Sequence, residues 1–192
     1  MKVTIVEFVT LDGVMQAPGR PDEDTRDGFA HGGWGGPYND HVMAAEMGKR
    51  MARGGGALLF GRRTYEDFYK VWPNRKDGNP FTDVLNRTKK YVASRTLTEP
   101  LPWVNSVLLS GDAVDAVSEL KRGGGEDLGV LGSGQLVQSL MRRNLIDEYL
   151  LLIHPLVLGT GRRLFGDAEV SLELVECVPT TKGVLIATYR PA

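Results

Sequence analysis

Two glycine turns carry the clearest chemistry in this chain, because each follows a short apolar segment and precedes a helical pattern. Gly132-Ser133-Gly134 comes directly after Leu128–Leu131, and Gly61 comes directly after Ala57–Phe60. Small residues let the backbone approach a ligand closely, and the free N–H groups at the start of a helix favour an anion. Each turn therefore predicts a phosphate site, and two such sites together indicate a nucleotide cofactor.

Neither turn is specific by itself. Gly61 is followed by Arg62, Arg63 and Thr64, two cations and a hydroxyl, which favours phosphate, but a glycine turn after a strand is also a common tight connection. The G-x-G-x-x-G fingerprint of a Rossmann domain should follow the first strand. Here the first strand ends in Leu11-Asp12-Gly13 instead, so the pattern disfavours a standard Rossmann domain.

Length and charge bound the class of protein. A chain of 192 residues with 42% hydrophobic and 24% charged residues fits one soluble domain, residues 1–192, with a full apolar core. Its net charge of −1 gives no broad attraction to nucleic acid or to an anionic membrane. No apolar run is long enough to span a bilayer or to form a secretory signal, so we expect a cytoplasmic protein.

The cysteine and the histidines exclude several kinds of site. Cys177 is the single cysteine, so it forms no internal disulfide or cysteine cluster, and its alternation with Val175 predicts an inert residue packed in a strand. His31, His41 and His154 lack the spacing of metal ligands. His154 lies in an apolar run that predicts a buried core position. We therefore expect no metal.

Strands and helices alternate along the chain and place both turns at the ends of strands. Apolar segments predict strands at Lys2–Thr10, Ala57–Phe60, Lys90–Ser94, Ser106–Leu109, Leu128–Leu131 and Glu148–Leu158. Helical spacing predicts helices over Tyr38–Arg53, Thr64–Val71, Asp112–Gly123 and the segment that begins at Gly134. Val170–Val178 and Val184–Tyr189 predict a closing antiparallel hairpin. This order indicates an α/β fold with a mixed, mostly parallel central sheet and flanking helices.

Three local features carry expectations of their own. The glycine- and proline-rich segment Asp12–Pro37 predicts a long loop, which is either a binding loop or lid or a disordered segment. Methionines at helical spacing in Tyr38–Arg53 predict a core-facing stripe, with Asn39 or Asp40 as the helix N-cap. Pro155, inside the last apolar run, predicts a kink or a bulge.

Several of these motifs occur together in one known fold. The segments that carry the likeness are Leu11–Val14, Gly61–Glu66, Tyr91–Arg95, Gly132–Gly134, His154–Gly161 and Leu164–Gly166. In this order the chain resembles the dihydrofolate reductase fold. Within that fold it is most similar to the reductase domain of bacterial bifunctional riboflavin-biosynthesis deaminase-reductases and their stand-alone relatives. No zinc deaminase motif precedes the domain, so the resemblance implies a stand-alone reductase.

The resemblance implies NADPH as the cofactor. In proteins that look like this, the two glycine turns hold the cofactor phosphates, and a strand end lies beside the adenosine. The matching phosphate positions here are Gly61, Arg62, Arg63, Thr64, Gly132, Ser133, Gly134, Gln135 and Leu136, and the adenosine positions are Ser94, Arg95 and Thr96. Arg62, Arg63 and Arg95 are suited to the 2′-phosphate that distinguishes NADPH from NADH. The alternative for each arginine is a solvated surface charge.

Hydride transfer is chemistry of the cofactor, so the protein needs to align the substrate and to supply at most one acid. In dihydrofolate reductase a carboxylate early on the helix after the long loop binds the pterin. Trp34, Pro37 and Asp40 occur here in a similar order with a slightly different gap. Asp40 is therefore a candidate acid, although the role of helix N-cap is the interpretation we favour for it. Asp12 is the second candidate, with turn formation as its alternative.

Two further side chains of the long loop are candidates for contact with bound molecules. Met15 follows the first strand closely and is placed to pack against the nicotinamide. Trp34 lies in a glycine-rich stretch and is suited to stacking on a flat heterocyclic substrate. The alternative for both is local packing within the loop.

These expectations describe an NADPH-dependent reductase that transfers hydride to a C=N or C=O bond of a small heterocyclic substrate. The substrate is pyrimidine- or pterin-like, and the protein resembles 5-amino-6-(5-phosphoribosylamino)uracil reductase. The alternatives are a true dihydrofolate reductase and an NADPH-binding module without turnover. The apolar run LLLIHPLVL continues into Gly159–Phe165. Relatives with this segment are often dimers that pair through their sheets, so we also expect a homodimer.

Overall fold

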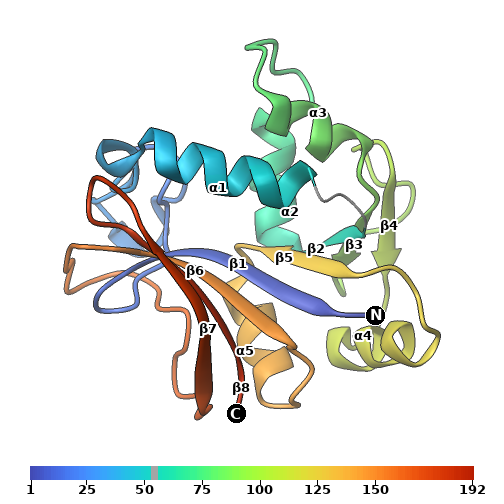
Figure 1. Ribbon diagram of the computed structural model, residues 1–192. Helices are drawn as coiled ribbons and strands as arrows, with labels where there is room; N and C mark the ends of the chain where they lie inside the picture. The colour runs from blue at the N-terminus through green and yellow to red at the C-terminus, as the bar shows by residue number, and fades with distance from the viewer. Residues whose placement is uncertain (53–55) are drawn as a thin grey trace.

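An eight-stranded sheet forms the centre of the computed structural model, which describes residues 1–52 and 56–192 (Figure 1). Its strands lie in the order β4-β3-β2-β5-β1-β6-β8-β7. Their bounds are β1 Val3–Thr10, β2 Ala57–Gly61, β3 Lys90–Ala93, β4 Ser106–Leu109, β5 Leu128–Leu131, β6 Glu148–His154, β7 Leu172–Pro179 and β8 Leu185–Pro191. The six strands from β4 to β6 in this order are parallel, β8 is antiparallel to β6, and β7 is antiparallel to β8. The predicted mixed, mostly parallel sheet with a C-terminal antiparallel hairpin is confirmed.

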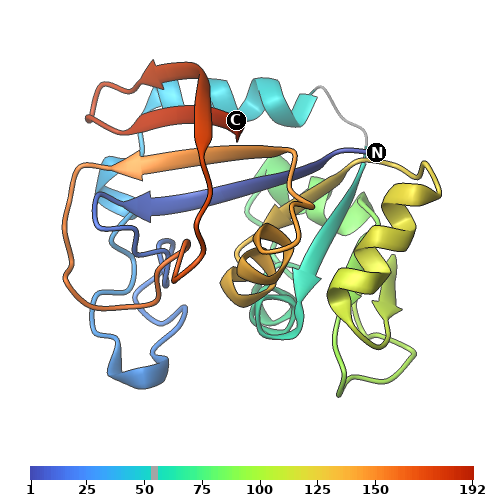
Figure 2. The same ribbon diagram turned by 90° about the horizontal axis from the view of Figure 1, so that it is seen from below.

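Helices cover both faces of this sheet. In the described residues they are α1 His41–Ala52, α2 Arg62–Val71, α3 Pro80–Arg87, α4 Ala113–Arg122 and α5 Gly134–Met141. Figures 1 and 2 show α1 over one face and α4 and α5 over the opposite face. The predicted end of the first helix, at Arg53, lies outside the described residues.

Strand β1 shows how the sheet builds a core on each side. Successive side chains of a strand point to opposite faces. Ile5 and Val9 belong to a buried cluster that includes Leu140 of α5, whereas Phe8 packs against a cluster that includes Met43 of α1. The predicted core position of the methionine stripe is therefore confirmed for Met43.

Helix α3 is an element that the sequence pattern does not predict. Asn79 caps it by accepting a hydrogen bond from the N–H of Phe81 at 2.9 Å, and Pro80 occupies its first turn. An asparagine followed by proline is a helix-start signal. The helix has only eight residues, and so short a segment shows too few turns for its apolar spacing to be recognised.

Strand β6 is shorter than predicted. It ends at His154 rather than at Leu158, because Pro155 has no N–H with which to continue a ladder. The N–H of Leu156 donates instead to the carbonyl of His154 at 2.8 Å and turns the chain. The predicted kink at Pro155 is thus the end of the strand.

The prediction that Cys177 packs inside a strand is wrong. Cys177 lies in β7, but its side chain is exposed. β7 is one of the two edge strands of the sheet, and most of its side chains are exposed. The alternation along β7 therefore does not report a buried face.

The long loop after β1 has a small core of its own. Val14, Ala17, Phe29 and Trp34 form a buried cluster within it, and short 3-10 turns occupy Arg26–Gly28 and Gly36–Tyr38. This packing supports the binding-loop alternative over a disordered segment. Among the described residues, the helices are all too short or too polar to cross a bilayer.

Candidate active site

The carboxyl ends of the parallel strands open onto a cleft of about 1690 Å³. In the sheet order β2-β5-β1-β6, the connection from β1 passes β5 to reach β2, and the connection from β5 passes β1 to reach β6. The two connections leave in opposite directions, which is the arrangement that opens a ligand crevice at the ends of parallel strands. The cleft is lined by the middle of β1, by the ends of β2, β3 and β5, by part of the long loop and by residues of α1.

Two side chains lock the glycine turns to each other on one wall of this cleft. The N–H of Gly61 donates to Ser133 Oγ at 2.9 Å, and the N–H of Ser133 donates to Thr64 Oγ1 at 3.0 Å. Ser133 Oγ in turn donates to the carbonyl of Leu131 at 3.1 Å. The two turns, which are far apart in the sequence, therefore form one rigid surface.

The backbone of the second turn leaves N–H groups for a ligand. Gly132 and Ser133 adopt left-handed φ values of 58° and 63°, and α5 begins at Gly134. Val137 is the first α5 residue whose N–H bonds within the helix, to the carbonyl of Ser133. The preceding N–H groups at the start of α5 therefore have no acceptor in the helix, as an anion site requires.

The two glycines of this turn, Gly132 and Gly134, differ in what a side chain would meet at each position. A Cβ added at Gly132 would lie 2.9 Å from Thr64 Cγ2, and one added at Gly134 would lie 2.7 Å from Met15 Sδ. Gly132 needs its glycine for the turn itself, since it combines a left-handed φ with a close neighbour. At Gly134 the close neighbour is the end of the flexible Met15 side chain, which can shift, so the geometry requires a glycine less strictly there than at Gly132.

The arginines of the cleft differ in whether they are already paired. Arg62 pairs with Glu66 at 3.2 Å along α2. Arg63 and Arg95 also line the cleft, and no ion pair to either of them is found within residues 1–52 and 56–192. Arg95 stands in a turn that Ser94 closes by accepting the N–H of Thr96 at 3.1 Å. Two cations are therefore available for an anionic ligand.

The structure brings the predicted cofactor positions together. Those that line the cleft are Met15, Gly61, Arg62, Arg63, Thr64, Ser94, Arg95, Thr96, Gly132, Ser133, Gly134, Gln135 and Leu136. They come from the ends of four strands and meet because those ends share one edge of the sheet. That they bind NADPH stays a prediction.

Asp40 lies outside the lining of the cleft. Its Oδ1 accepts the N–H of Met43 at 2.8 Å, and its Oδ2 accepts the N–H and the hydroxyl of Thr181 at 2.7 and 2.6 Å and the N–H of Lys182 at 3.2 Å. The bond from Met43, followed by those from Thr181 and Lys182, holds the pKa of the Asp40 carboxyl well below its usual range. Asp40 is thus a helix cap that also fastens the β7–β8 turn.

Asp12 also lies outside the lining of the cleft. Its carboxylate accepts the hydroxyl of Thr10 at 2.5 Å and the N–H groups of Gly159 and Leu158 at 2.8 and 3.2 Å. The bond from Thr10 is the largest cause that lowers the pKa of the Asp12 carboxyl far below its usual value. Asp12 therefore joins the end of β1 to the segment that follows β6.

Trp34 is a packing residue of the loop. It is buried, and its Nε1 donates to the carbonyl of Gln16 at 2.7 Å. Its ring meets the buried His154 edge-on, with the ring centroids 5.0 Å apart. Trp34 does not line the cleft, so the geometry supports the packing alternative rather than stacking on a substrate.

The structure identifies a carboxyl that sequence reasoning missed. Glu7 lines the cleft, its exposed fraction is 4%, and its Oε1 is buried without a hydrogen-bond partner in the described part of the chain. Burial, and to a lesser extent the charge of Glu23, raises the pKa of the Glu7 carboxyl well above its usual value. The signal was present in the alternation of β1, where Glu7 falls on the apolar face of Ile5 and Val9.

Comparison with known proteins fits this arrangement of strands and turns. The family model described as the RibD C-terminal domain matches residues 1–186. The chain belongs to the RibD C-terminal domain family. This family is one of reductase domains, as the resemblance of the motifs implies.

This RibD C-terminal domain is also similar to a curated protein and to solved structures. Uncharacterized protein YyaP of Bacillus subtilis strain 168 is 28% identical over 138 residues, which cover 69% of this chain and 72% of YyaP. A Shewanella sp. PV-4 protein named as a candidate for riboflavin biosynthesis has a TM-score of 0.69 at 21% identity, covering 100% of this chain and 99% of that one. Dihydrofolate reductase from Enterococcus faecalis has a TM-score of 0.58 at 14% identity, covering 99% and 96%. These structures show the dihydrofolate reductase-like fold.

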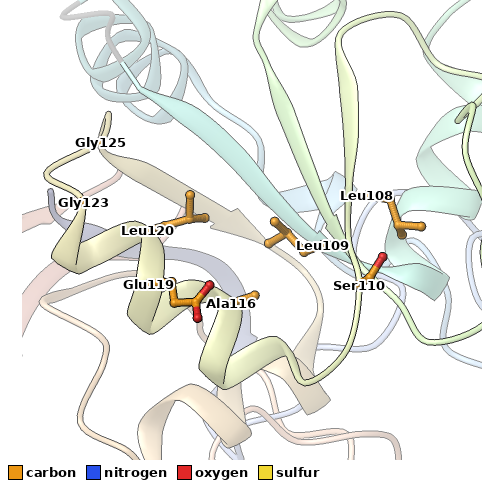
Figure 3. A pocket seen from close by; sticks show the side chains of 8 residues that line it. All are labelled: Leu108, Leu109, Ser110, Ala116, Glu119, Leu120, Gly123 and Gly125. Atoms are coloured by element: carbon orange, nitrogen blue, oxygen red, sulfur yellow. The ribbon is translucent and has the colours of Figure 1, made fainter.

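A second pocket of this RibD C-terminal domain lies between the end of β4 and α4, and its volume is about 490 Å³ (Figure 3). Its residues are Leu108, Leu109, Ser110, Ala116, Glu119, Leu120, Gly123 and Gly125. The pocket contains neither glycine turn and no arginine, so it lacks the anion-binding features of the cleft. Within residues 1–52 and 56–192, no group of three or more His, Cys, Asp or Glu side chains is placed to hold a metal ion.

Proposed function

We propose that the protein is an NADPH-dependent reductase that transfers hydride to a C=N or C=O bond of a small heterocyclic substrate. The observation that carries this proposal is the pair of interlocked glycine turns, in which Ser133 bonds both Gly61 and Thr64 beside the start of α5. A surface of backbone N–H groups at a helix start suits a pyrophosphate. Membership of a family of reductase domains supports the same conclusion.

The residues of the cleft fit NADPH in charge and in kind. The N–H groups at the start of α5 would hold its phosphates, and Arg63 and Arg95, which have no ion pair among the described residues, would hold the 2′-phosphate. Met15, which contacts the start of α5 closely, would pack against the nicotinamide. When bound, NADPH supplies the hydride. The side chains then orient the substrate, exclude water and supply a proton.

The bonds of Asp40 and Asp12 bear on the two alternatives. Asp40 is the candidate here for the carboxylate with which a dihydrofolate reductase binds a pterin, and it already accepts hydrogen bonds from Met43, Thr181 and Lys182. This weakens the alternative of a true dihydrofolate reductase. Because both predicted acids are occupied, a module that binds NADPH without turnover is the second candidate.

One experiment separates these functions. NADPH and NADH are titrated against the protein by fluorescence, and NADPH oxidation is then followed by absorbance with a panel of pyrimidine and pterin substrates. We expect saturable, NADPH-selective binding and oxidation with at least one substrate. Binding without oxidation by any substrate would favour the binding module, and absence of saturable binding would overturn the reductase proposal.

A further inference from the structure

Glu7 stands where the sheet opens beside the glycine turn. β1 and β5 pair as far as Val6 and Leu131. Beyond this pair β5 turns away at Gly132, whereas β1 continues beside β6 to Thr10. Glu7 is therefore the first residue of β1 that borders the space left by β5, level with the predicted phosphate turn, and it lines the cleft.

The surroundings of Glu7 are apolar. Because side chains alternate along a strand, Glu7 points to the same face as Ile5 and Val9, and both of these belong to the main buried cluster together with Leu136 of α5. Met15 packs against the same cluster. A glutamate on this apolar face of β1 packs less well than a hydrophobic residue would, and its buried Oε1 has no hydrogen-bond partner in the described residues. Such a cost to stability is typical of functional positions.

Other carboxyls of the cleft are already engaged. Within the described lining they are Glu23, Asp24, Asp67 and Asp112. Glu23 accepts backbone N–H groups of the loop, Asp24 and Asp67 pair with Arg26, and Asp112 caps α4. Among the described carboxyls that line the cleft, Glu7 is the one with neither a hydrogen bond nor an ion pair.

The electrostatics of this position favour a neutral acid. Burial removes the water that would stabilise a carboxylate, and the nearby charge of Glu23 adds repulsion, so the pKa of Glu7 lies well above its ordinary value. Glu23 comes from the long loop, and no cation is found paired with Glu7 in the described residues. A protonated carboxyl carries one O–H donor as well as an acceptor oxygen. Glu7 is thus equipped to donate a proton rather than to bind a cation.

We propose that Glu7 is the catalytic acid of the cleft, and that it recognises a neutral heterocycle through an sp² nitrogen or carbonyl oxygen next to the carbon that is reduced. This rests on the proposed reductase function. With the hydride that bound NADPH would supply, the carbon of a C=N bond would gain a C–H bond and the π electron pair would move to the nitrogen. The nitrogen takes the proton of Glu7 as the O–H bond breaks. A proton taken up from bulk solvent then restores the carboxyl, so the reaction consumes one hydride and one solvent proton in all.

The test compares Glu7→Gln with the wild-type protein and with Glu173→Gln, the same substitution at an exposed position of β7. Glutamine has the size of glutamate but cannot donate an acidic proton. Three quantities are measured: NADPH affinity by fluorescence, the infrared band of a protonated carboxyl at neutral pH, and turnover of the best substrate in the pyrimidine and pterin panel. Thermal unfolding confirms that each variant is folded.

We expect the wild-type protein and Glu173→Gln to show the protonated carboxyl band, and Glu7→Gln to lack it. Glu7→Gln should bind NADPH within about twofold of wild type, and its turnover should fall by about a hundredfold or more. Where no panel substrate is reduced, the wild-type band should still shift when 7,8-dihydropterin and NADP⁺ are added together.

Three results would overturn the proposal. They are a wild-type protein that lacks the band at neutral pH, a Glu7→Gln variant that turns over like wild type, and a band that 7,8-dihydropterin leaves unmoved in a protein without turnover. Each of these leaves the reductase function standing if NADPH binds. A wild-type protein that fails to bind NADPH overturns the reductase function and the role of Glu7 together.

Discussion

The N–H of Ser133 donates a hydrogen bond to the hydroxyl oxygen of Thr64 at 3.0 Å, although 69 positions separate the two residues in the chain. Ser133 has a left-handed backbone conformation, which a serine adopts only at some energetic cost. The bond to Thr64 offsets part of that cost and ties the turn after β5 to the start of α2.

Thr64→Val should therefore damage cofactor binding more than it damages the fold. Valine keeps the shape of threonine but removes the acceptor for Ser133, which should lower the free energy of unfolding by about 1 kcal/mol. We expect NADPH affinity to fall by about tenfold, since the N–H groups of the turn are no longer held in place. Thr64→Ser, which keeps the hydroxyl, is the control. A Thr64→Val variant with wild-type NADPH affinity would contradict the proposed role of the turn.

Selectivity for NADPH over NADH should depend on Arg63 or Arg95 and not on Arg62. A charge-assisted hydrogen bond to phosphate contributes about 1.5–3 kcal/mol, which is about a tenfold to 150-fold change in affinity. Replacing the arginine that binds the 2′-phosphate by Gln should weaken NADPH by this factor and leave NADH nearly unchanged. Arg62→Gln is the matched control, because Arg62 pairs with Glu66. Equal affinities of the wild-type protein for both nucleotides would refute this prediction.

Asp40→Asn should lower thermal stability and leave turnover unchanged. The pKa of the Asp40 carboxyl is lower in the folded protein than its ordinary value of 3.8. Its contribution to stability is therefore present above pH 3.8 and is lost as the pH falls through the lower folded value. The melting temperature of wild type should exceed that of Asp40→Asn at neutral pH, and this difference should become smaller in acid. If turnover of Asp40→Asn falls while its stability is unchanged, Asp40 would instead be a catalytic acid.

The stability difference between wild type and Glu7→Gln should depend on pH in the opposite direction to that for Asp40→Asn. The pKa of Glu7 is raised in the folded protein, so the folded state binds more protons than the unfolded chain once the pH rises above the ordinary value of 4.5. The wild-type protein should lose stability relative to Glu7→Gln as the pH increases from there toward the raised value. Urea unfolding of both proteins across this range measures the difference. A difference that is independent of pH would mean that Glu7 is ionised in the folded protein.

A homodimer through the outer strands remains our proposal for the state in solution. Leu174 and Val175 of β7 are 57% and 50% exposed, and Leu185 of β8 is 40% exposed. Light scattering should give twice the chain mass of 21.0 kDa, and Val175→Lys should shift it toward the monomer. Val104→Lys, at an exposed valine outside these strands and outside the Gly159–Phe165 segment, is the matched control. A wild-type monomer across micromolar concentrations would exclude the dimer.

Much of the fold could be predicted from the sequence, because local patterns report local structure. The apolar runs of β1, β2, β5 and β6 and the alternation of the final hairpin identify strands, and the motif order indicates the dihydrofolate reductase-like arrangement. Helix α3 and the end of β6 were missed, since a helix of eight residues shows little periodicity and a proline is compatible with either a kink or a stop. The exposed β7 was misjudged because alternation does not say which strand lies at an edge.

Parts of the candidate site could be predicted from local sequence, and other parts depend on contacts between distant residues. Residue types and spacing alone identified the two glycine turns and the arginines near them, because phosphate binding depends on local backbone freedom and charge. The sequence could not show that the carboxylate of Asp40 accepts a hydrogen bond from Thr181, or that the carboxylate of Asp12 accepts one from Gly159. These partners are more than a hundred positions away in the chain. It also could not show that β5 turns away beside Glu7. Whether a carboxyl is a clamp or an acid is decided by its burial and its partners, and only the tertiary structure brings those together.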